Sequence, residues 1–312
     1  MRSLASFIMR GRMQAVLITI LFAGLSLPLA PFIYLSGGAV ALVTLRLGAV
    51  SGFSVVLMSG AVISLLAMIA MGSLLPGIVF MAMIWLPVWA LSVQLRQSGS
   101  LNYVIAITCG IGLLLTLVAH LLLGDPVVWW QQVLEPLLAT MGDAAGGVEM
   151  AAFTEQLSRL MTAIVVVALT LNILFGLFIG RWWQSQLYNP GGFQLEFHQL
   201  RLPKALAWVT LVVMLVSMFA QQGAGMLAGN LMIVLVFFYL LQGVAIIHGV
   251  VAERKMSVGW LIGLYFLMVF ALPQVAALLM LLGLGDTWLD IRRRLSRPEK
   301  DQQKSDDQDS VD

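Results

Sequence analysis

The sequence predicts an all-α fold, a polytopic transmembrane helical bundle of about ten spans. Of its 312 residues, 60% are hydrophobic and 10% are charged, whereas a soluble domain carries about 25% charged residues. Its mean hydropathy of +0.96 is too high for a compact soluble fold of this length. Runs of about 18 or more apolar residues recur along the chain, as membrane-spanning helices require. The alternating pattern of a membrane β-barrel is absent from the sequence.

Nine apolar segments support this prediction. They are Met13–Ala30, Phe32–Val50, Ser51–Met71, Leu75–Val93, Leu101–Leu123, Leu160–Gly180, Ala205–Ala220, Leu227–Val251 and Ser257–Leu284. The first segment follows a basic stretch, as in a signal peptide, but Pro31 and further apolar segments come after it. We therefore interpret it as an uncleaved signal anchor.

Polar stretches divide the chain into four predicted regions: an N-terminal membrane bundle (1–123), an extracytoplasmic insert (124–158), a C-terminal membrane bundle (159–296) and a disordered cytoplasmic tail (297–312). The insert contains "WWQQVLEPLL" and "MAAFTEQLS", which we expect to form interfacial helices. Its acidic residues, which we expect to be solvated, are Asp125, Glu135, Asp143, Glu149 and Glu155. The tail is charged and lacks aromatic residues, which is typical of disorder.

Lysine and arginine residues set the orientation, because they are retained on the cytoplasmic side. Arg2, Arg10 and Arg12 place the N-terminus inside. Nine spans would put the basic residues that follow Ile291 outside; these are Arg292, Arg293, Arg294, Arg297, Lys300 and Lys304. Splitting the last segment at Pro273 gives ten spans with both termini inside, which we prefer. If Phe32–Val50 is instead re-entrant, eight spans also keep the tail inside, but Arg96 then lies outside.

The sequence offers little for catalysis. His120, His198 and His248 are scattered over three regions, and Cys109 is the single cysteine, so we expect no metal site. The sequence contains no HExxH, Walker or GxSxG motif. We therefore predict a protein that is not an enzyme and has no cofactor. A formal net charge of +2 gives no reason to expect a nucleic-acid partner.

Polar and aromatic residues at membrane depth provide the candidate ligand pocket. Asn172, Gln242 and Gln274 lie inside apolar runs, where burial is costly unless the amide is paired. Most such amides join helices, and the rest line a polar site. Tryptophans favour the membrane interface, but Trp129, Trp130 and His120 are candidates for an outward-facing pocket together with these amides. Glycine pairs four residues apart, such as Gly176 and Gly180, are ordinary membrane composition.

Two charged residues near helix ends form a candidate structural pair. Asp286 follows the small residues "GLG", and Arg46 closes the second segment at the same predicted membrane face. A charge partly buried there is costly unless it is paired, so we predict that Asp286 pairs with Arg46 while Asp290 stays solvated. The alternative is that Arg46 reaches lipid phosphates and that Asp286 only caps a turn near Arg293 or Arg294.

Two stretches resemble a known family. "SLPLAPFIYLSGGAVALVTLRLGAVSG" contains prolines, small residues and an arginine two residues before a glycine, and "LLGLGDTWLDIRRR" closes an apolar run with an aspartate and basic residues. Together they resemble the YybS-like family of bacterial multi-pass membrane proteins, which has no settled activity. More remotely, the chain is similar to the substrate-capturing S subunits of energy-coupling-factor transporters. The resemblance implies a multi-pass protein of the bacterial cytoplasmic (inner) membrane and supplies no catalytic residues.

From these features we expect a non-enzymatic integral membrane protein that binds a small molecule or serves as a transporter-like subunit. The alternative is a membrane scaffold that recruits cytoplasmic or envelope proteins through Arg181–Lys204 and the tail. The expected partners are the lipid bilayer, a small-molecule ligand and proteins at the cytoplasmic face.

Overall fold

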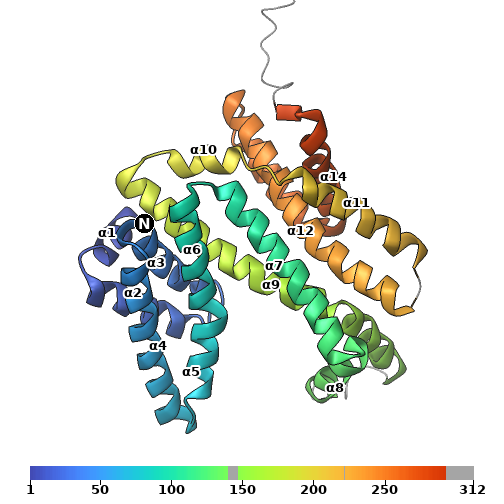
Figure 1. Cartoon of the computed structure of the whole chain (residues 1–312), viewed down its shortest axis with the longest axis horizontal. Coiled ribbons are helices and arrows are strands. Elements are labelled where there is room, and N and C mark those ends of the chain that lie inside the picture. The colour runs from blue at the N-terminus through green and yellow to red at the C-terminus, as the bar shows by residue number, and fades with distance from the viewer. Residues whose placement is uncertain (140–146, 221, 293–312) are drawn as a thin grey trace, which may run out of the picture. The chain divides into compact units, whose positions relative to one another are not determined.

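The computed structural model describes residues 1–139, 147–220 and 222–292, which form helices and no strand (Figure 1). The helices are α1 (Arg2–Ile8), α2 (Arg12–Leu25), α3 (Phe32–Leu47), α4 (Ala49–Met71), α5 (Leu75–Phe80), the π-helix η1 (Met81–Trp85), α6 (Leu86–Ser98), α7 (Leu101–Leu123), α8 (Pro126–Ala139), α9 (Gly147–Tyr188), α10 (Gly192–His198), α11 (Lys204–Phe219), α12 (Gln222–Glu253), α13 (Gly259–Phe270) and α14 (Leu272–Leu289). The predictions for Asp143, for the basic residues from Arg293 onward and for the tail 297–312 lie outside the described residues, as does the side chain of Glu149.

Within the described residues, six helices are long and apolar enough to cross a membrane. They are Ala49–Met71, Leu75–Ser98, Leu101–Leu123, Ala151–Tyr188, Gly223–Glu253 and Leu272–Leu289. Four shorter apolar helices are α2, α3, α11 and α13. Each segment of the ten-span prediction therefore corresponds to a helix, counting α5, η1 and α6 as one. The number of crossings and the orientation stay predictions.

The predicted break at Pro273 is confirmed as a break between two helices. Helix α13 ends at Phe270, and α14 begins at Leu272 with the proline in its first turn. Between them Ala271 adopts φ −138° and ψ 42°, outside the helical region. Proline is well tolerated in a first helical turn because its missing N–H would have had no partner there.

The polar insert differs from the prediction in one respect. "WWQQVLEPLL" lies in the separate helix α8, as expected. However, "MAAFTEQLS" is no separate interfacial helix, because it continues into the following apolar segment as one 42-residue helix, α9. At 1.5 Å per residue this helix is about 63 Å long, roughly twice the hydrocarbon thickness of a bilayer. Glu155 and Arg159 pair at 2.7 Å along its exposed surface, which supports helix in this polar part.

The chain divides into two compact units. Unit 1 comprises residues 1–197 and 209–235, and unit 2 comprises residues 198–208 and 236–312. In unit 1, α3 is the central helix, because its residues 36–45 are buried and it packs along α9. A Cβ atom at Gly180 would lie 2.9 Å from the carbonyl oxygen of Gly38. The pair Gly176 and Gly180 therefore does permit a close helix crossing.

Two tryptophans that the interface rule would place at the membrane surface lie in the core of unit 1. Trp85 and Trp183 are fully buried. The indole of Trp85 donates a hydrogen bond to the hydroxyl of Ser36 at 2.9 Å, and that hydroxyl donates to the carbonyl of Thr19 at 2.8 Å. A buried indole N–H usually has such a partner, and Ser36 provides it for Trp85, whereas Nε1 of Trp183 has none among the described residues.

In unit 2, α12 and α14 cross closely at two glycines (orange and red in Figure 1). A Cβ atom at Gly243 would lie 2.3 Å from the carbonyl oxygen of Leu279, and one at Gly283 would lie 2.4 Å from that of Tyr239. Neither position has room for a larger residue. This contact brings the backbone of α14 within reach of the side chains of α12.

Candidate functional site

A buried amide fills the space between α12, α14 and the segment before α11. Gln242 is fully buried. Its Nε2 donates to the carbonyl of Gly283 at 2.7 Å, and its Oε1 accepts from the N–H of Leu202 at 2.8 Å. Both ends of the amide are thus satisfied within unit 2, as a buried polar group requires. Gln242 joins secondary-structure elements rather than lining a polar path.

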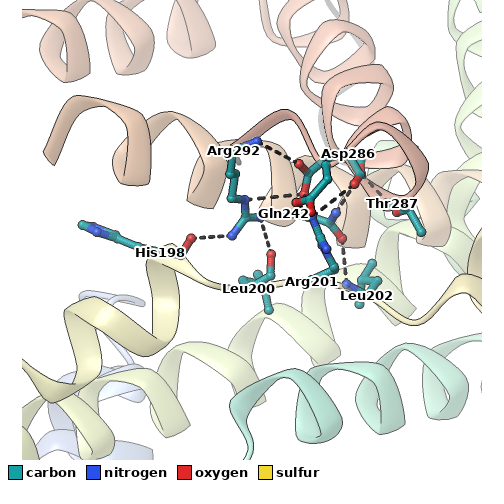
Figure 2. A network of polar contacts seen from close by, with 10 residues as sticks. His198, Leu200, Arg201, Leu202, Gln242, Asp286, Thr287 and Arg292 are labelled. Carbon is teal, nitrogen blue, oxygen red and sulfur yellow. Dashed lines mark hydrogen bonds and ion pairs between the residues drawn. The ribbon is translucent and has the colours of Figure 1, made fainter. Parts of the chain in front are cut away.

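Next to this amide, a buried carboxylate faces two arginines (Figure 2). Asp286 near the end of α14 is fully buried. Its Oδ2 lies 3.4 Å from Nη2 of Arg201 and 3.5 Å from Nε of Arg292, and its Oδ1 accepts from the N–H of Arg292 at 3.4 Å. Each carboxylate oxygen thus has a cationic side chain or a backbone donor. Such neutralisation is what allows a charge to remain buried.

The same arginines bind the backbone around them. The guanidinium of Arg292 donates to the carbonyls of His198 and Leu200. Arg201 also binds Asp290 at 2.5 Å, and Asp290 adopts φ +49° at the C-terminal cap of α14. We name these five residues, Arg201, Gln242, Asp286, Asp290 and Arg292, the Asp286 network. With two aspartates and two arginines it is electrically balanced, which suits a structural role better than acid–base chemistry.

Two groups near this network have shifted pKa values. Burial lowers the pKa of Arg201, but its hydrogen bond with Asp290 and the charges of Asp286 and Asp290 outweigh this and raise it overall. Burial lowers the pKa of His198, and the neighbouring His248 and the positive charge of Arg292 lower it further. Arg201 therefore stays charged, and His198 is favoured in its neutral form.

Three aromatic side chains lie in a row beside the network. The rings of His198 and His248 are 6.4 Å apart, and the hydroxyl of Tyr265 lies 3.3 Å from Nε2 of His248. Nδ1 of His248 is 3.0 Å from the carbonyl of Val244, so we assign its proton there. Nε2 then accepts from Tyr265. This hydrogen bond joins α13 to α12.

A partly open apolar groove of about 640 Å³ runs between α12 and α13, with Leu282 of α14 at its side. We name it the α12–α13 groove; its walls include Ile246, Val250 and Val251 of α12 and Gly259, Gly263 and Leu267 of α13. A Cβ atom at Gly263 would meet no heavy atom within 4 Å, so this glycine opens onto empty space. Ser257 provides a polar side chain at one end of the lining.

The turn at that end of the groove has a defined hydrogen-bond pattern. The N–H of Met256 donates to the carbonyl of Val251 at 2.9 Å, and that of Lys255 donates to Ala252 at 3.2 Å. This is the Schellman pattern of a helix C-terminus, in which the C′ residue is usually glycine. Here that residue is Lys255, at φ +50°. The pattern brings Val251 and Met256 together at the end of the groove, and Lys255 is exposed beside them.

The six candidate pocket residues lie in different surroundings. In unit 1, Nδ1 of His120 bonds the carbonyl of Thr116 in its own helix, and Trp130 donates to the hydroxyl of Thr162 at 3.0 Å. The ring of Trp129 packs edge-on against Trp130. Among these six candidates, Nε2 of His120 and Oδ1 of Asn172 are buried without a hydrogen-bond partner among the described residues.

In unit 2, Gln242 belongs to the Asp286 network and Gln274 is exposed. None of the six candidates lines the α12–α13 groove. The same holds for a smaller pocket of about 380 Å³ in unit 1 beside Asn230. There the amide of Asn230 accepts from the N–H of Ala163 and donates to the carbonyl of Arg159, joining α12 to α9.

The two members of the candidate charge pair have other partners. The guanidinium of Arg46 lies 4.1 Å from the ring centroid of Tyr188, within unit 1. Asp286 binds Arg201 and Arg292 within unit 2. Arg46 is exposed, and the burial cost of Asp286 is offset within unit 2, so neither residue needs the other. Asp290 keeps a side chain that is 45% exposed, and it also pairs with Arg201, a partner that was not predicted.

Comparisons with known proteins supply no family for this chain: no family description, curated protein or solved structure matches it. Among the residues that the structure describes, no three His, Cys, Asp or Glu side chains gather where they could hold a metal ion. The candidate site therefore rests on the geometry of unit 2, namely the Asp286 network and the α12–α13 groove.

Proposed function

We propose that this protein is a multi-pass integral membrane protein that lacks enzymatic activity and binds a small hydrophobic molecule in the α12–α13 groove. The volume of about 640 Å³ lies within the range of about 300–1,000 Å³ typical of small-molecule sites. The observation that carries the proposal is the open space at Gly263. In a helix packed to ordinary density a missing side chain is filled by neighbours, whereas this one faces a cavity lined by apolar residues.

The Asp286 network supports the absence of enzymatic activity. Its carboxylates have arginine partners, and its amide is satisfied at both ends. A catalytic acid or base needs a group that can exchange a proton with a substrate. We therefore propose that the network is structural: it holds residues 198–202 against α12 and α14 and so stabilises unit 2.

The scaffold alternative has less support. Recruitment through Arg181–Lys204 needs charged side chains that are available to a partner. In the structure Arg181 forms an ion pair with Glu196, and Arg201 pairs with two aspartates. Two of the three Lys and Arg side chains of this segment thus serve the fold, and Lys204 is exposed. The transporter-like role, the relation to the YybS-like family and the bacterial inner membrane stay predictions from the sequence.

Mass analysis of hydrophobic molecules that co-purify with the protein in detergent tests the proposal. We expect about one tightly held molecule per wild-type chain and its loss in Gly263→Leu, because the new side chain enters the groove without meeting other atoms. Gly110→Leu is the matched control, since Gly110 of α7 is exposed and also has open space around it. Equal retention by all three proteins would contradict the proposal.

A further inference from the structure

We infer that the ligand of the α12–α13 groove is an anionic phospholipid, with one acyl chain along α13 and its phosphate at the end lined by Ser257, close to Lys255 in the chain. This inference rests on the proposed function, because it names the occupant of the same groove. It depends on three further observations: the length of the groove, its charged end and the strained backbone of Lys255.

The groove has the form of an acyl-chain site. On α13 its lining runs from Gly259 through Gly263 to Leu267. These positions recur at four-residue spacing, so they form one stripe about 12 Å long on a single helix face. Apart from Ser257 at one end, the lining side chains are apolar. An apolar groove with a polar group at one end suits a hydrocarbon chain better than a compact polar metabolite.

Three charged residues adjoin the Ser257 end of the groove in the chain. Glu253, Arg254 and Lys255 are exposed in the turn between α12 and α13, and their formal charges sum to +1. The first residue of α13, Gly259, lines the same end, so the positive end of that helix dipole adds to the attraction for a phosphate. Trp260 is also here and 64% exposed, which is the environment that tryptophan favours at headgroup depth.

Lys255 occupies a backbone position that normally belongs to glycine. Lys255 and Asp290 are the non-glycine residues with positive φ among the residues described. Asp290 forms an ion pair with Arg201 at its position, so its side chain has a defined role. Strained non-glycine residues cluster at functional positions. For Lys255 the adjacent groove end offers such a role, because its ammonium group can bind the phosphate of a lipid whose chain lies in the groove.

The test is a competition between two lipids with identical acyl chains. Protein in detergent receives equal amounts of phosphatidylglycerol and phosphatidylcholine, and native mass spectrometry gives the ratio of the two bound lipids. Each cation near a lipid surface is worth about a fivefold preference for an anionic headgroup. We expect wild type to prefer phosphatidylglycerol, Lys255→Gly to lose about fivefold of that preference, and Glu253→Gln to gain about fivefold.

Lys255→Gly keeps the turn intact because glycine readily adopts positive φ. This variant therefore removes the charge of residue 255 without disturbing the fold. Arg12→Gln, which removes an exposed cation far away in the sequence, is the control and should leave the ratio unchanged.

If Gly263→Leu removes bound lipid but the ratio does not depend on residues 253 and 255, the headgroup inference fails and the proposed function stands. If Gly263→Leu removes nothing, both fail. A second copy of the chain as the occupant would appear as a dimer that Gly263→Leu dissociates, and this result would overturn the lipid inference.

Discussion

The fully buried carboxylate of Asp286 lies 3.4 Å from the guanidinium of Arg201, a residue 85 positions earlier in the chain. This contact, with that of Arg292, ties the segment before α11 to the end of α14. Removing either arginine would leave the buried carboxylate with a single cation, so both contacts should stabilise unit 2.

Arg201→Met should destabilise the protein by about 1.5–3 kcal/mol, because Asp286 loses a charge-assisted hydrogen bond and keeps Arg292 as its remaining cation. The midpoint of thermal unfolding in detergent, or the yield of folded protein, measures the effect. Arg159→Met is the control, since Arg159 pairs with Glu155 in an exposed i,i+4 arrangement that is worth about 0.3–0.5 kcal/mol. Equal losses in the two variants would show that the Asp286 network contributes little.

A charge exchange separates this network from the pair predicted on sequence grounds. Arg46→Asp combined with Asp286→Arg should be no better folded than the worse single variant, because Asp286→Arg places a third cation beside Arg201 and Arg292. Gel-filtration profiles of the single and double variants measure this. Recovery of a monodisperse profile in the double variant would instead support the Arg46–Asp286 pair.

Two neighbouring glycines of α14 should respond in opposite directions to the same substitution. Gly283→Ala should destabilise by about 1–3 kcal/mol, because the new methyl group would meet the backbone of α12. Gly285→Ala has open space and should stabilise by about 0.4–1 kcal/mol through reduced freedom of the unfolded chain. Thermal unfolding of both variants compares them directly, and a stable Gly283→Ala protein would rule out the close crossing of α12 and α14.

Lys255→Gly should raise the unfolding midpoint, since a non-glycine residue in the left-handed region costs about 1–2 kcal/mol. Lys255→Ala removes the same charge but keeps the strained backbone, so it should give no such gain. The comparison is best made in lipid-free detergent, where a bound headgroup cannot contribute. Equal midpoints for the glycine and alanine variants would contradict the strain at this turn.

His198 should make the protein less stable in mild acid. Its pKa in the folded protein is lowered by burial, by the neighbouring His248 and by the charge of Arg292, so the unfolded chain binds more protons. Stability is therefore fully present above the ordinary histidine pKa of about 6.5 and falls as the pH drops below it. His198→Asn, which keeps the backbone carbonyl that accepts from Arg292, should flatten this decrease in unfolding midpoints between neutral and mildly acidic buffers.

The elements of the fold follow from local patterns, which is why the sequence predicts them well. Apolar runs mark the ten helical segments, and Pro273 marks the break between α13 and α14 because proline has no N–H to continue a helix. The continuation of α9 into the insert was missed, because polar residues give no signal for where a solvated helix begins. A run such as "MAAFTEQLSRL" suits a separate interfacial helix equally well.

The site depends on contacts between residues far apart in the chain, and these have no local signal. Asp286 and Arg201 are charged residues close to apolar segments, which marks both as costly to bury, but their pairing depends on how the helices cross. The close packing at Gly243 and Gly283 likewise depends on how α12 and α14 cross. The groove is harder still to predict. Glycine is common in membrane helices, so the sequence does not show that the neighbours of Gly263 leave space around it.

An experimental density map of the protein in lipid nanodiscs tests the central claim most directly. The account predicts a continuous, elongated density along Gly259–Leu267 that ends beside Ser257 and Lys255 and is absent from the map of Gly263→Leu. A wild-type groove without such density, or one filled by a helix of a second copy, would contradict it.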